Sequence, residues 1–303
     1  MSFKEKWLEA VDKQNSVLCA GLDPAEFEMG REEKSLPEGV IKRDWALKYV
    51  EAVAPFCAAV KPNIQYWKNA EITGGPQIIE GGMRTLREVA DLSHSLGLVT
   101  IDDSKLADIG STNEAGMYHS AQKGYDAVTL ALFAGNMEEA AKQLEEQGIG
   151  GIHMCLMSNP EFARVKNQLV PVQEGDAYHI EDVMEARFSA LEYVRKYIQL
   201  AHDANKFGLD GVVIGAPSKK NHITEREIEN ARRYVGDEML VLLPGVGAQG
   251  GEADAIWKYF AADRVIVNVG RSLMLPNGSN STPEEQAATA KHYMTMLNEL
   301  RAA

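Results

Sequence analysis

The sequence predicts an α/β fold, a (β/α)8 barrel that forms one domain over residues 1–303, with an extra helix at the N-terminus. Short apolar runs alternate with amphipathic segments along the whole chain, and eight such pairs fit into its 303 residues. This alternation is typical of parallel strands joined by helices. Eight units at this length favour a closed barrel. A doubly wound open sheet has the same alternation and is the alternative.

The predicted elements follow from apolar periodicity and from glycines at helix ends. The N-terminal helix covers residues 3–13, with Phe3, Trp7 and Val11 on one side. Gly97 and Gly124 are expected to end two of the later helices, and Asp44 to cap another. Residues 159–180 are polar and irregular, longer than most loops of this kind, and are a candidate active-site lid. Strands are expected at 16–22, 58–61, 98–101, 127–130, 151–156, 211–214, 240–243 and 264–269, and the other helices at 44–53, 75–95, 111–123, 137–147, 182–206, 224–235, 252–260 and 283–301.

Charge and composition narrow the class of protein. The formal net charge is -13 and 45% of the residues are hydrophobic. An acidic chain of this kind is not expected to bind nucleic acid or an anionic membrane, since both need a basic face. Three cysteines in apolar runs suggest buried thiols of a reducing compartment. No apolar run approaches the ~18 residues of a membrane span, and the charged N-terminus lacks a signal core. A soluble, cytoplasmic protein is expected.

A charged stretch follows the third predicted strand. Asp102, Asp103, Lys105 and Asp108 come directly after the apolar run 98–101. Asp103 and Lys105 are two residues apart, so on a strand they point to the same side. Opposite charges at a buried strand end are costly unless they are paired or used. The spacing alone fits a salt-bridged strand end and a catalytic pair equally well.

Other predicted strands also end in charged or polar residues, which a barrel would gather at one face. Strand one ends in Asp23, strand two in Lys61, strand five in Ser158 and Asn159, and strand eight in Gly270 and Arg271. These positions make that face the expected site of function.

A glycine-rich turn covers residues 244–251, after the seventh predicted strand. Its backbone N–H groups are free to approach an anion, just before a helix. Barrels often bind phosphate with the loops after strands seven and eight, and Arg271 can add a guanidinium. The alternative is a tight turn beside a surface arginine, but the matching position of Arg271 favours phosphate.

The remaining polar residues point to no metal and no cofactor. The seven histidines include no spaced pair, and His153 is expected to be a core residue with a satisfied nitrogen. A lysine beside carboxylates keeps its ammonium form. It is suited to donating a proton to a forming carbanion, whereas a Schiff-base lysine needs its charge disfavoured. The residues therefore predict a phosphate-anchored ligand with an Asp/Lys network at the reacting end.

The motif Asp103-x-Lys105-x-x-Asp108-Ile109-Gly110-x-Thr112 resembles the signature of the orotidine 5′-phosphate decarboxylases. The resemblance covers roughly residues 16–275 and is closest to the longer bacterial branch. Six further pieces match in order, at successive strand ends: Leu22-Asp23-Pro24, Val60-Lys61-Pro62-Asn63, Met157-Ser158-Asn159-Pro160, Gly215-Ala216, residues 244–251 and Val269-Gly270-Arg271.

The resemblance implies a (β/α)8 homodimer that removes CO2 from orotidine 5′-monophosphate to give UMP, the last step of pyrimidine synthesis, without metal or cofactor. By the motif match, Lys105 protonates C6 of the pyrimidine and Asp103 lies against the leaving carboxylate. Lys61 and Asp108 complete an array of alternating charges, with Asp108 supplied by the neighbouring subunit. Such an array would stabilise the carbanion electrostatically.

The resemblance also assigns the residues that bind substrate. Asp23, Lys61, Asp108 and Thr112 would hold the ribose hydroxyls, with Thr112 reaching across the dimer like Asp108. Ser158 would bond the base, and Gln249 and Arg271, with the backbone of Gly270, would take the phosphate.

Two other functions remain as alternatives. A Mg²⁺-dependent phosphate-sugar enzyme, such as a 3-keto-gulonate-6-phosphate decarboxylase or a hexulose-phosphate synthase, shares the Asp-x-Lys-x-x-Asp core; Thr112 and Ser158 favour the nucleotide enzyme over it. A catalytically silent sensor would bind UMP without turnover, but all four charged positions are intact.

Overall fold

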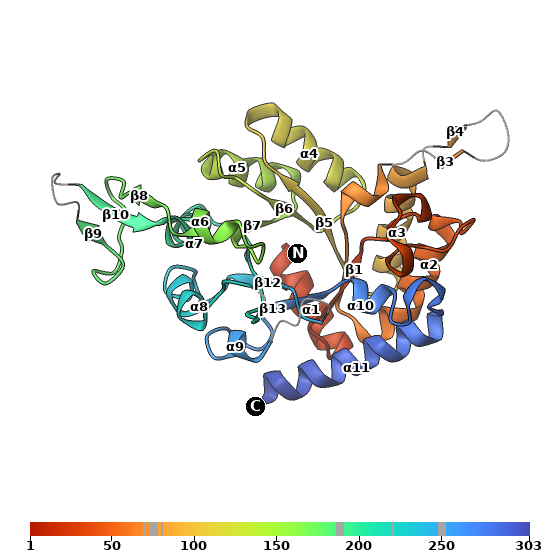
Figure 1. Ribbon diagram of the computed structural model, residues 1–303. Helices are drawn as coiled ribbons and strands as arrows, with labels where there is room; N and C mark the ends of the chain where they lie inside the picture. The colour runs from red at the N-terminus through yellow and green to blue at the C-terminus, as the bar shows by residue number, and fades with distance from the viewer. Residues whose placement is uncertain (69–70, 73–77, 80, 186–190, 220, 248–252) are drawn as a thin grey trace.

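A computed structural model confirms the barrel: eight parallel strands of the described chain close into one sheet (Figure 1). The structure describes residues 1–68, 71–72, 78–79, 81–185, 191–219, 221–247 and 253–303. The strands of the barrel, in order around it, are β1 (Leu18–Leu22), β2 (Ala59–Pro62), β5 (Val99–Leu106), β6 (Ala127–Leu130), β7 (Gly150–Leu156), β11 (Gly211–Ile214), β12 (Leu240–Pro244) and β13 (Val265–Val269), which returns to β1.

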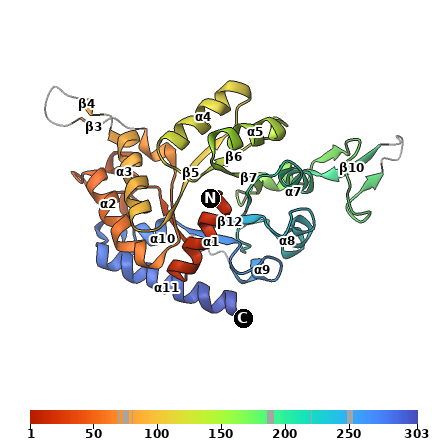
Figure 2. The ribbon, with the colours of Figure 1, turned by 180° about the vertical axis from the view of Figure 1, so that it is seen from behind.

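The strands are apolar because they are buried by one another inside and by helices outside. Every residue of β1, β2, β6, β7 and β11 is buried. Figure 2 shows the helical layer from behind. The helices are α1 (Phe3–Gln14), α2 (Lys42–Val53), α3 (Gly81–Ser95), α4 (Gly110–Gln122), α5 (Met137–Gln147), α6 (Phe162–Lys166), α7 (Lys196–Lys206), α8 (Glu225–Arg232), α9 (Asp254–Trp257), α10 (Arg271–Met274) and α11 (Pro283–Ala302).

The predicted N-terminal helix exists and contacts the amino ends of the barrel strands. Trp7 of α1 is fully buried, and its Nε1 donates to the carbonyl of Asp263, 2.7 Å away and just before β13. Lys6 pairs with Asp126, the residue before β6, at 2.7 Å. A capping box at Ser2 and Glu5 starts the helix. The helix therefore covers the end of the barrel opposite the predicted site.

Most predicted helix ends agree with the structure, but the helix predicted over residues 75–95 begins only at Gly81, after the strand β4 (Ile78–Ile79), and the predicted cap of α2 is wrong. Gly97 and Gly124 follow α3 and α4 with φ of +80° and +87°, a backbone that suits glycine. The N-cap of α2 is Ile41 and has no side-chain cap bond, while Asp44 lies in the first turn and bonds Arg43. An acid in the first turn is favourable to the helix dipole without capping it.

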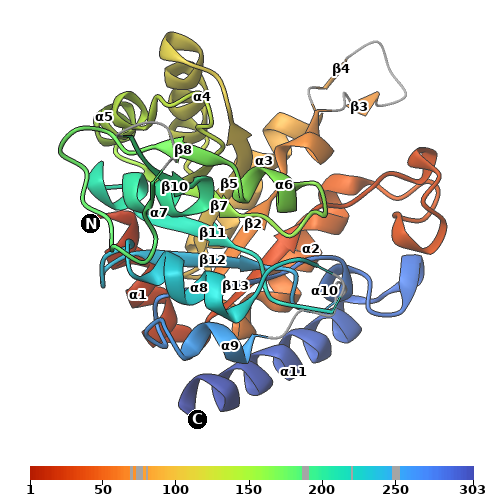
Figure 3. The same cartoon turned by 60° about the vertical axis from the view of Figure 1, so that its left-hand side comes forward.

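The predicted long helix over residues 182–206 is wrong in its first part. Among the described residues of this range only α7 is helical; before it lie β9 (Met184–Glu185) and β10 (Glu192–Arg195), and residues 186–190 lie outside the described chain. They form an antiparallel sheet with β8 (Leu169–Pro171), part of the stretch that was expected to be irregular. This arm projects from the barrel and comes forward in Figure 3. Because it packs little, its apolar residues do not mark a buried helix face: in β10 only Val194 is buried.

Three smaller findings bear on the predictions. Cys19, Cys57 and Cys155 are free and buried, as expected. His153 is fully buried, and its Nδ1 accepts from the N–H of Leu132 at 3.4 Å, while its Nε2 has no partner in the described chain. The expectation of a core histidine with a satisfied nitrogen is therefore confirmed. No helix within the described residues is long and apolar enough to cross a membrane.

Candidate active site at the carboxyl ends of the strands

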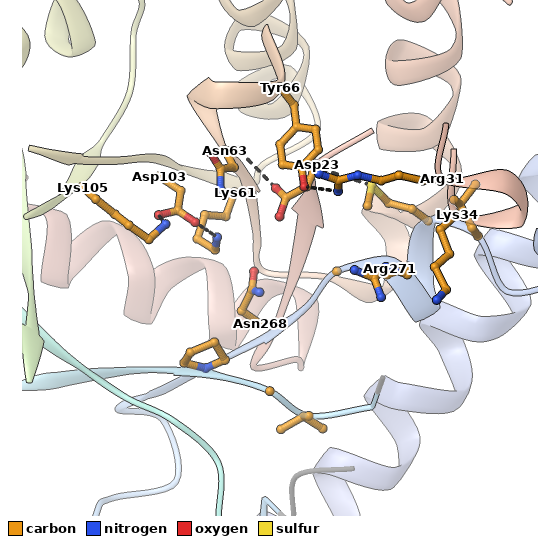
Figure 4. A pocket seen from close by; sticks show the side chains of 16 residues that line it. Asp23, Arg31, Lys34, Lys61, Asn63, Tyr66, Asp103, Lys105, Asn268 and Arg271 are labelled. Carbon is orange, nitrogen blue, oxygen red and sulfur yellow. Dashed lines mark hydrogen bonds and ion pairs between the residues drawn. The ribbon is translucent and has the colours of Figure 1, made fainter. Parts of the chain in front are cut away.

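A cavity of about 300 Å³ opens at the carboxyl ends of β1, β2, β5, β12 and β13 (Figure 4). Its wall carries five cationic side chains and two carboxylates, which gives a formal charge of +3 in a chain whose net charge is -13. A small anion is the ligand that such a site attracts. The charged lining residues are Asp23, Arg31, Lys34, Lys61, Asp103, Lys105 and Arg271, and the polar ones include Asn63, Tyr66 and Asn268.

Asp103 lies between two lysines at one end of the cavity. Its Oδ2 accepts from Lys61 and its Oδ1 from Lys105, and Thr129 Oγ1 donates to Oδ1 at 3.0 Å. Lys61 and Asp103 are only 4% and 7% exposed. The structure thus brings together three of the four predicted catalytic residues, Lys61, Asp103 and Lys105.

The pKa shifts keep this array charged. Burial alone would raise the pKa of Asp103, but Lys61 and Lys105 outweigh it and hold that pKa well below its usual range. Burial would likewise lower the pKa of Lys61, and the charges of Asp103 and Asp23 raise it instead. A carboxylate at Asp103 and an ammonium group at Lys61 are therefore the stable forms at neutral pH.

Lys105 reaches Asp103 by an irregular backbone and not by regular strand alternation. Its φ is +50°, and the pairing of β5 with β6 shifts register between Asp102 and Leu106. Thr129 Oγ1 accepts the Lys105 N–H at 3.0 Å and so holds the irregularity. A left-handed conformation costs a residue with a Cβ about 1–2 kcal/mol. Local strain of this kind is typical of functional sites.

Asp23 lies beside this array at the end of β1. Its Oδ1 accepts from the N–H of Asn63 at 3.2 Å. β1 pairs with β2 so that Gly21 is opposite Lys61, which brings the two strand ends into one cavity. Burial raises the pKa of Asp23, and the charge of Lys61 opposes that shift.

The predicted phosphate end is partly described. Gly270 and Arg271 line the cavity at the end of β13, where a Cβ on Gly270 would meet nothing within 4 Å, so an anion has room to approach. Gly247 has φ +87°, and a Cβ there would lie 2.5 Å from Tyr293 Oη, so the turn requires glycine. Gln249 lies outside the described residues.

Three further predicted residues are not part of the cavity wall. Asp108, which follows β5, and Thr112, in the first turn of α4, are exposed, and Asp108 Oδ1 accepts from the N–H of Ile109 at 2.8 Å. Ser158 follows β7 and packs against Gly215, since a Cβ added to Gly215 would lie 3.0 Å from the Cβ of Ser158. The candidate lid, residues 159–180, contributes nothing to the described wall.

Sequence reasoning missed four polar residues of the wall. Arg31 and Lys34 lie in a loop that was predicted only as polar, and Tyr66 was not singled out. Asn268 is a polar residue within the apolar strand β13, a signal that could have found it. Its Oδ1 is buried and has no partner among the described residues, so it is able to accept from a ligand.

Elsewhere in the described chain, Asp176, His202 and Asp203 form a group that could hold a metal. They lie on the arm and α7, away from the cavity, and Lys206 pairs with Asp176 at 2.6 Å. In the cavity, both carboxylate oxygens of Asp103 pair with lysines, so neither is free to act as a metal ligand.

Comparisons with known proteins identify the family of the chain. The sequence model of the orotidine 5′-phosphate decarboxylase / HUMPS family matches residues 16–280. An orotidine 5′-phosphate decarboxylase of Polaromonas naphthalenivorans is 30% identical over 302 residues, 97% of this chain and 95% of the relative. One of Variovorax paradoxus is 29% identical over 296 residues, 96% of each chain.

Solved structures show the same fold. The OMP decarboxylase of Leishmania donovani superposes with a TM-score of 0.69 at 20% identity and covers 100% of both chains. The enzyme of Methanocaldococcus jannaschii, complexed with the inhibitor BMP, gives 0.59 at 22% identity, over 93% of this chain and 98% of that one. This chain belongs to the orotidine 5′-phosphate decarboxylase / HUMPS family.

Proposed function

We infer that the protein converts orotidine 5′-monophosphate to UMP and CO2. The observation that carries this function is the Lys61–Asp103–Lys105 array in a cavity whose other end presents Arg271. The two relatives of similar length are both orotidine 5′-phosphate decarboxylases, and the family model covers most of the chain. The substrate has a carboxylate and a phosphate at opposite ends, which suits this distribution of charge.

The chemistry needs a place for an electron pair. When the bond between C6 and the carboxylate breaks, CO2 leaves and the pair stays on C6, where the ring offers no ready acceptor. The ammonium groups of Lys61 and Lys105 are fixed beforehand by Asp103, so they stabilise the growing charge without reorganising. Lys105 then gives a proton to C6, which forms the C–H bond of UMP, and the lysine recovers its proton from water.

The same reasoning assigns the binding residues. Asp23 and Lys61 face the centre of the cavity and are suited to bonding ribose hydroxyls. Arg271, the Gly270 backbone and Gln249 would take the phosphate, and Ser158 the base. Residues 159–180 begin beside Ser158, which makes them a candidate lid over that end. Three buried free cysteines support a cytoplasmic location.

A homodimer with shared sites accounts for the residues that do not reach the cavity. Asp108 and Thr112 are exposed, as they would be if a partner subunit's cavity received them. Beside them Ile109 is 57% exposed and Tyr118 46% exposed. Burial of such apolar side chains by a second copy would stabilise the pair.

Turnover is the direct test of the proposed function. The purified protein is incubated with orotidine 5′-monophosphate, and loss of pyrimidine absorbance is followed together with release of UMP, with and without a chelator. Turnover that survives the chelator supports the proposal. Turnover lost with the chelator would favour the Mg²⁺-dependent relatives, and UMP binding without turnover would favour a silent sensor.

Mixing of two inactive variants tests the shared site. Asp108→Asn and Lys105→Ala proteins are combined under conditions where labelled subunits are seen to exchange. Some activity should return, because half of the sites in a mixed dimer regain a full set of residues. Complete inactivity despite demonstrated exchange would contradict the contribution of Asp108 across the interface.

A further inference from the structure

Three cations gather at the end of the cavity away from Asp103. Figure 4 shows Lys34 beside Arg271, with Arg31 next to Tyr66. Within the described part of the chain, the side chains of Lys34 and Arg271 have no hydrogen bond and no ion pair. Like charges that face one cavity without a counter-charge repel each other, and an anion between them would relieve this.

Arg31 is held in place by an aromatic side chain. Its Nη1 donates to Tyr66 Oη at 2.8 Å, and its guanidinium lies 5.4 Å from the centre of the Tyr66 ring. Tyr66 belongs to the 3₁₀ turn η4 (Ile64–Trp67), whose backbone is tied to the loop after β1 by Lys42. Lys42 is buried and bonds both the Tyr66 carbonyl and Glu26. A guanidinium fixed in this way loses little freedom when it binds.

The loop that carries Arg31 and Lys34 is built and anchored. Gly30 and Glu32 both have positive φ, +64° and +50°, and reverse the chain around the turn η2 (Glu32–Lys34). The N–H of Leu36 bonds the carbonyl of Ala25 at 2.8 Å and closes the loop.

The outer side of this loop is also held. Ser279 Oγ donates to the carbonyl of Glu32 at 3.0 Å. Glu33 packs against Gly278, since a Cβ added to Gly278 would lie 3.4 Å from the Cβ of Glu33. Glu33 is not part of the cavity wall. The loop therefore presents its two cations to the cavity and keeps its acids off the wall.

We propose that Arg31 and Lys34 are phosphate-binding residues that act with Arg271. The assignment rests on the proposed function, since it identifies the anion as the 5′-phosphate of the nucleotide. A phosphate monoester carries about two negative charges at neutral pH, and the substrate carboxylate adds one. The described wall has a formal charge of +3, and without Arg31 and Lys34 it would have only +1. The loop thus supplies the charge that a nucleotide with two anionic groups requires.

Binding of UMP and of uridine separates this role from a structural one. Arg31→Gln, Lys34→Gln and the double variant are compared with wild type by calorimetry. Lys48→Gln, an exposed lysine of α2 outside the cavity wall, is the matched control. Each cavity variant should weaken UMP about tenfold, the typical worth of a charge-assisted bond. Uridine affinity should stay within about twofold, since uridine lacks the phosphate, and the control should change neither.

The outcomes are distinct. Selective loss of UMP affinity, with a weaker dependence on salt, supports the proposal. Equal weakening of UMP and uridine would mean that the loop only shapes the site, and unchanged UMP affinity would mean that the two cations do not reach the phosphate; either result overturns it. Wild-type protein that binds no UMP would overturn the proposed function, and this inference with it.

Discussion

Two buried carboxylates at opposite ends of the barrel have similar partners and different roles. Asp103 lies at the carboxyl ends of the strands between Lys61 and Lys105. Asp126, at the amino ends, is only 5% exposed and bonds Lys6 at 2.7 Å and His94 at 2.9 Å. In both cases burial would raise the pKa and the cations outweigh it, bringing that of Asp126 to about 2.

The difference lies in what surrounds the two acids. Asp126 also accepts from Thr100, from its N–H at 2.8 Å and its Oγ1 at 3.0 Å, and so joins α1, α3 and β5 through regular backbone. Asp103 faces a cavity with surplus positive charge, and its partner Lys105 has a strained backbone. A shifted pKa therefore marks both acids, while of the two only Asp103 lies beside backbone strain and uncompensated charge, which are typical of functional sites.

The largest expected effect is on turnover. Lys105→Ala removes the proposed proton donor and one cation of the array, so kcat should fall by about a thousandfold or more. UMP should still bind, because the phosphate end is intact. Steady-state kinetics and calorimetry on the same preparation measure both. A variant that keeps substantial turnover would show that Lys105 is not the donor and that the pair is a salt bridge only.

A smaller effect is expected on stability, from the left-handed backbone at Lys105. At this position glycine should be more stabilising than alanine, the reverse of the usual order in a helix. Lys105→Gly should be more stable than Lys105→Ala by about 1 kcal/mol, because glycine adopts a φ of +50° without a Cβ clash. At Lys48, in the helix α2, the order should be reversed, since alanine is the better helix former there. Urea unfolding of the four variants compares the two sites. If Lys105→Ala were more stable than Lys105→Gly, the backbone at position 105 would not be strained.

Part of the fold and of the candidate site could be predicted from the sequence. The barrel strands were predictable because buried parallel strands are apolar throughout, and Lys61, Asp103 and Lys105 because they end such strands. Residues 182–185 and 191–195 were mistaken for helix, since apolar spacing indicates a helix face only where that face packs on a core. Arg31 and Lys34 were missed because positive φ at Gly30 and Glu32, and not sequence spacing, turns them toward the cavity.

The smallest expected effect concerns the pH dependence of the amino end. The hydrogen bond to Asp126 raises the pKa of His94 above its usual 6.5. Stability from this pair is therefore complete below pH 6.5 and is lost as pH rises through the raised value. His94 is 41% exposed, so the contribution is about 1 kcal/mol or less. His94→Gln should accordingly differ from wild type at pH 5.5 and match it at high pH; an equal difference at both would contradict the ion pair.

The charge of Asp126 makes stability depend on pH in the opposite direction, because its contribution is lost as the pH falls. Its pKa is lowered from 3.8 to about 2, so its contribution is present above pH 3.8 and is lost as pH falls through about 2. Melting temperatures of wild type and Asp126→Asn should therefore approach each other as pH falls through this window. A constant gap between the two would show that the charge of Asp126 contributes nothing.

The most direct test of the account compares Asp103→Asn with Asp126→Asn in two readouts, turnover of orotidine 5′-monophosphate per folded molecule and stability to urea. Asp103→Asn should lose turnover by about a thousandfold while enough folded protein remains to measure it. Asp126→Asn should lose about 1–3 kcal/mol of stability, because the buried carboxylate loses its charge-assisted hydrogen bonds to the half-exposed Lys6 and His94, and should keep turnover within a few-fold. If Asp103→Asn stays active, or if folded Asp126→Asn is as inactive as Asp103→Asn, the division between a reacting end and a structural end is wrong.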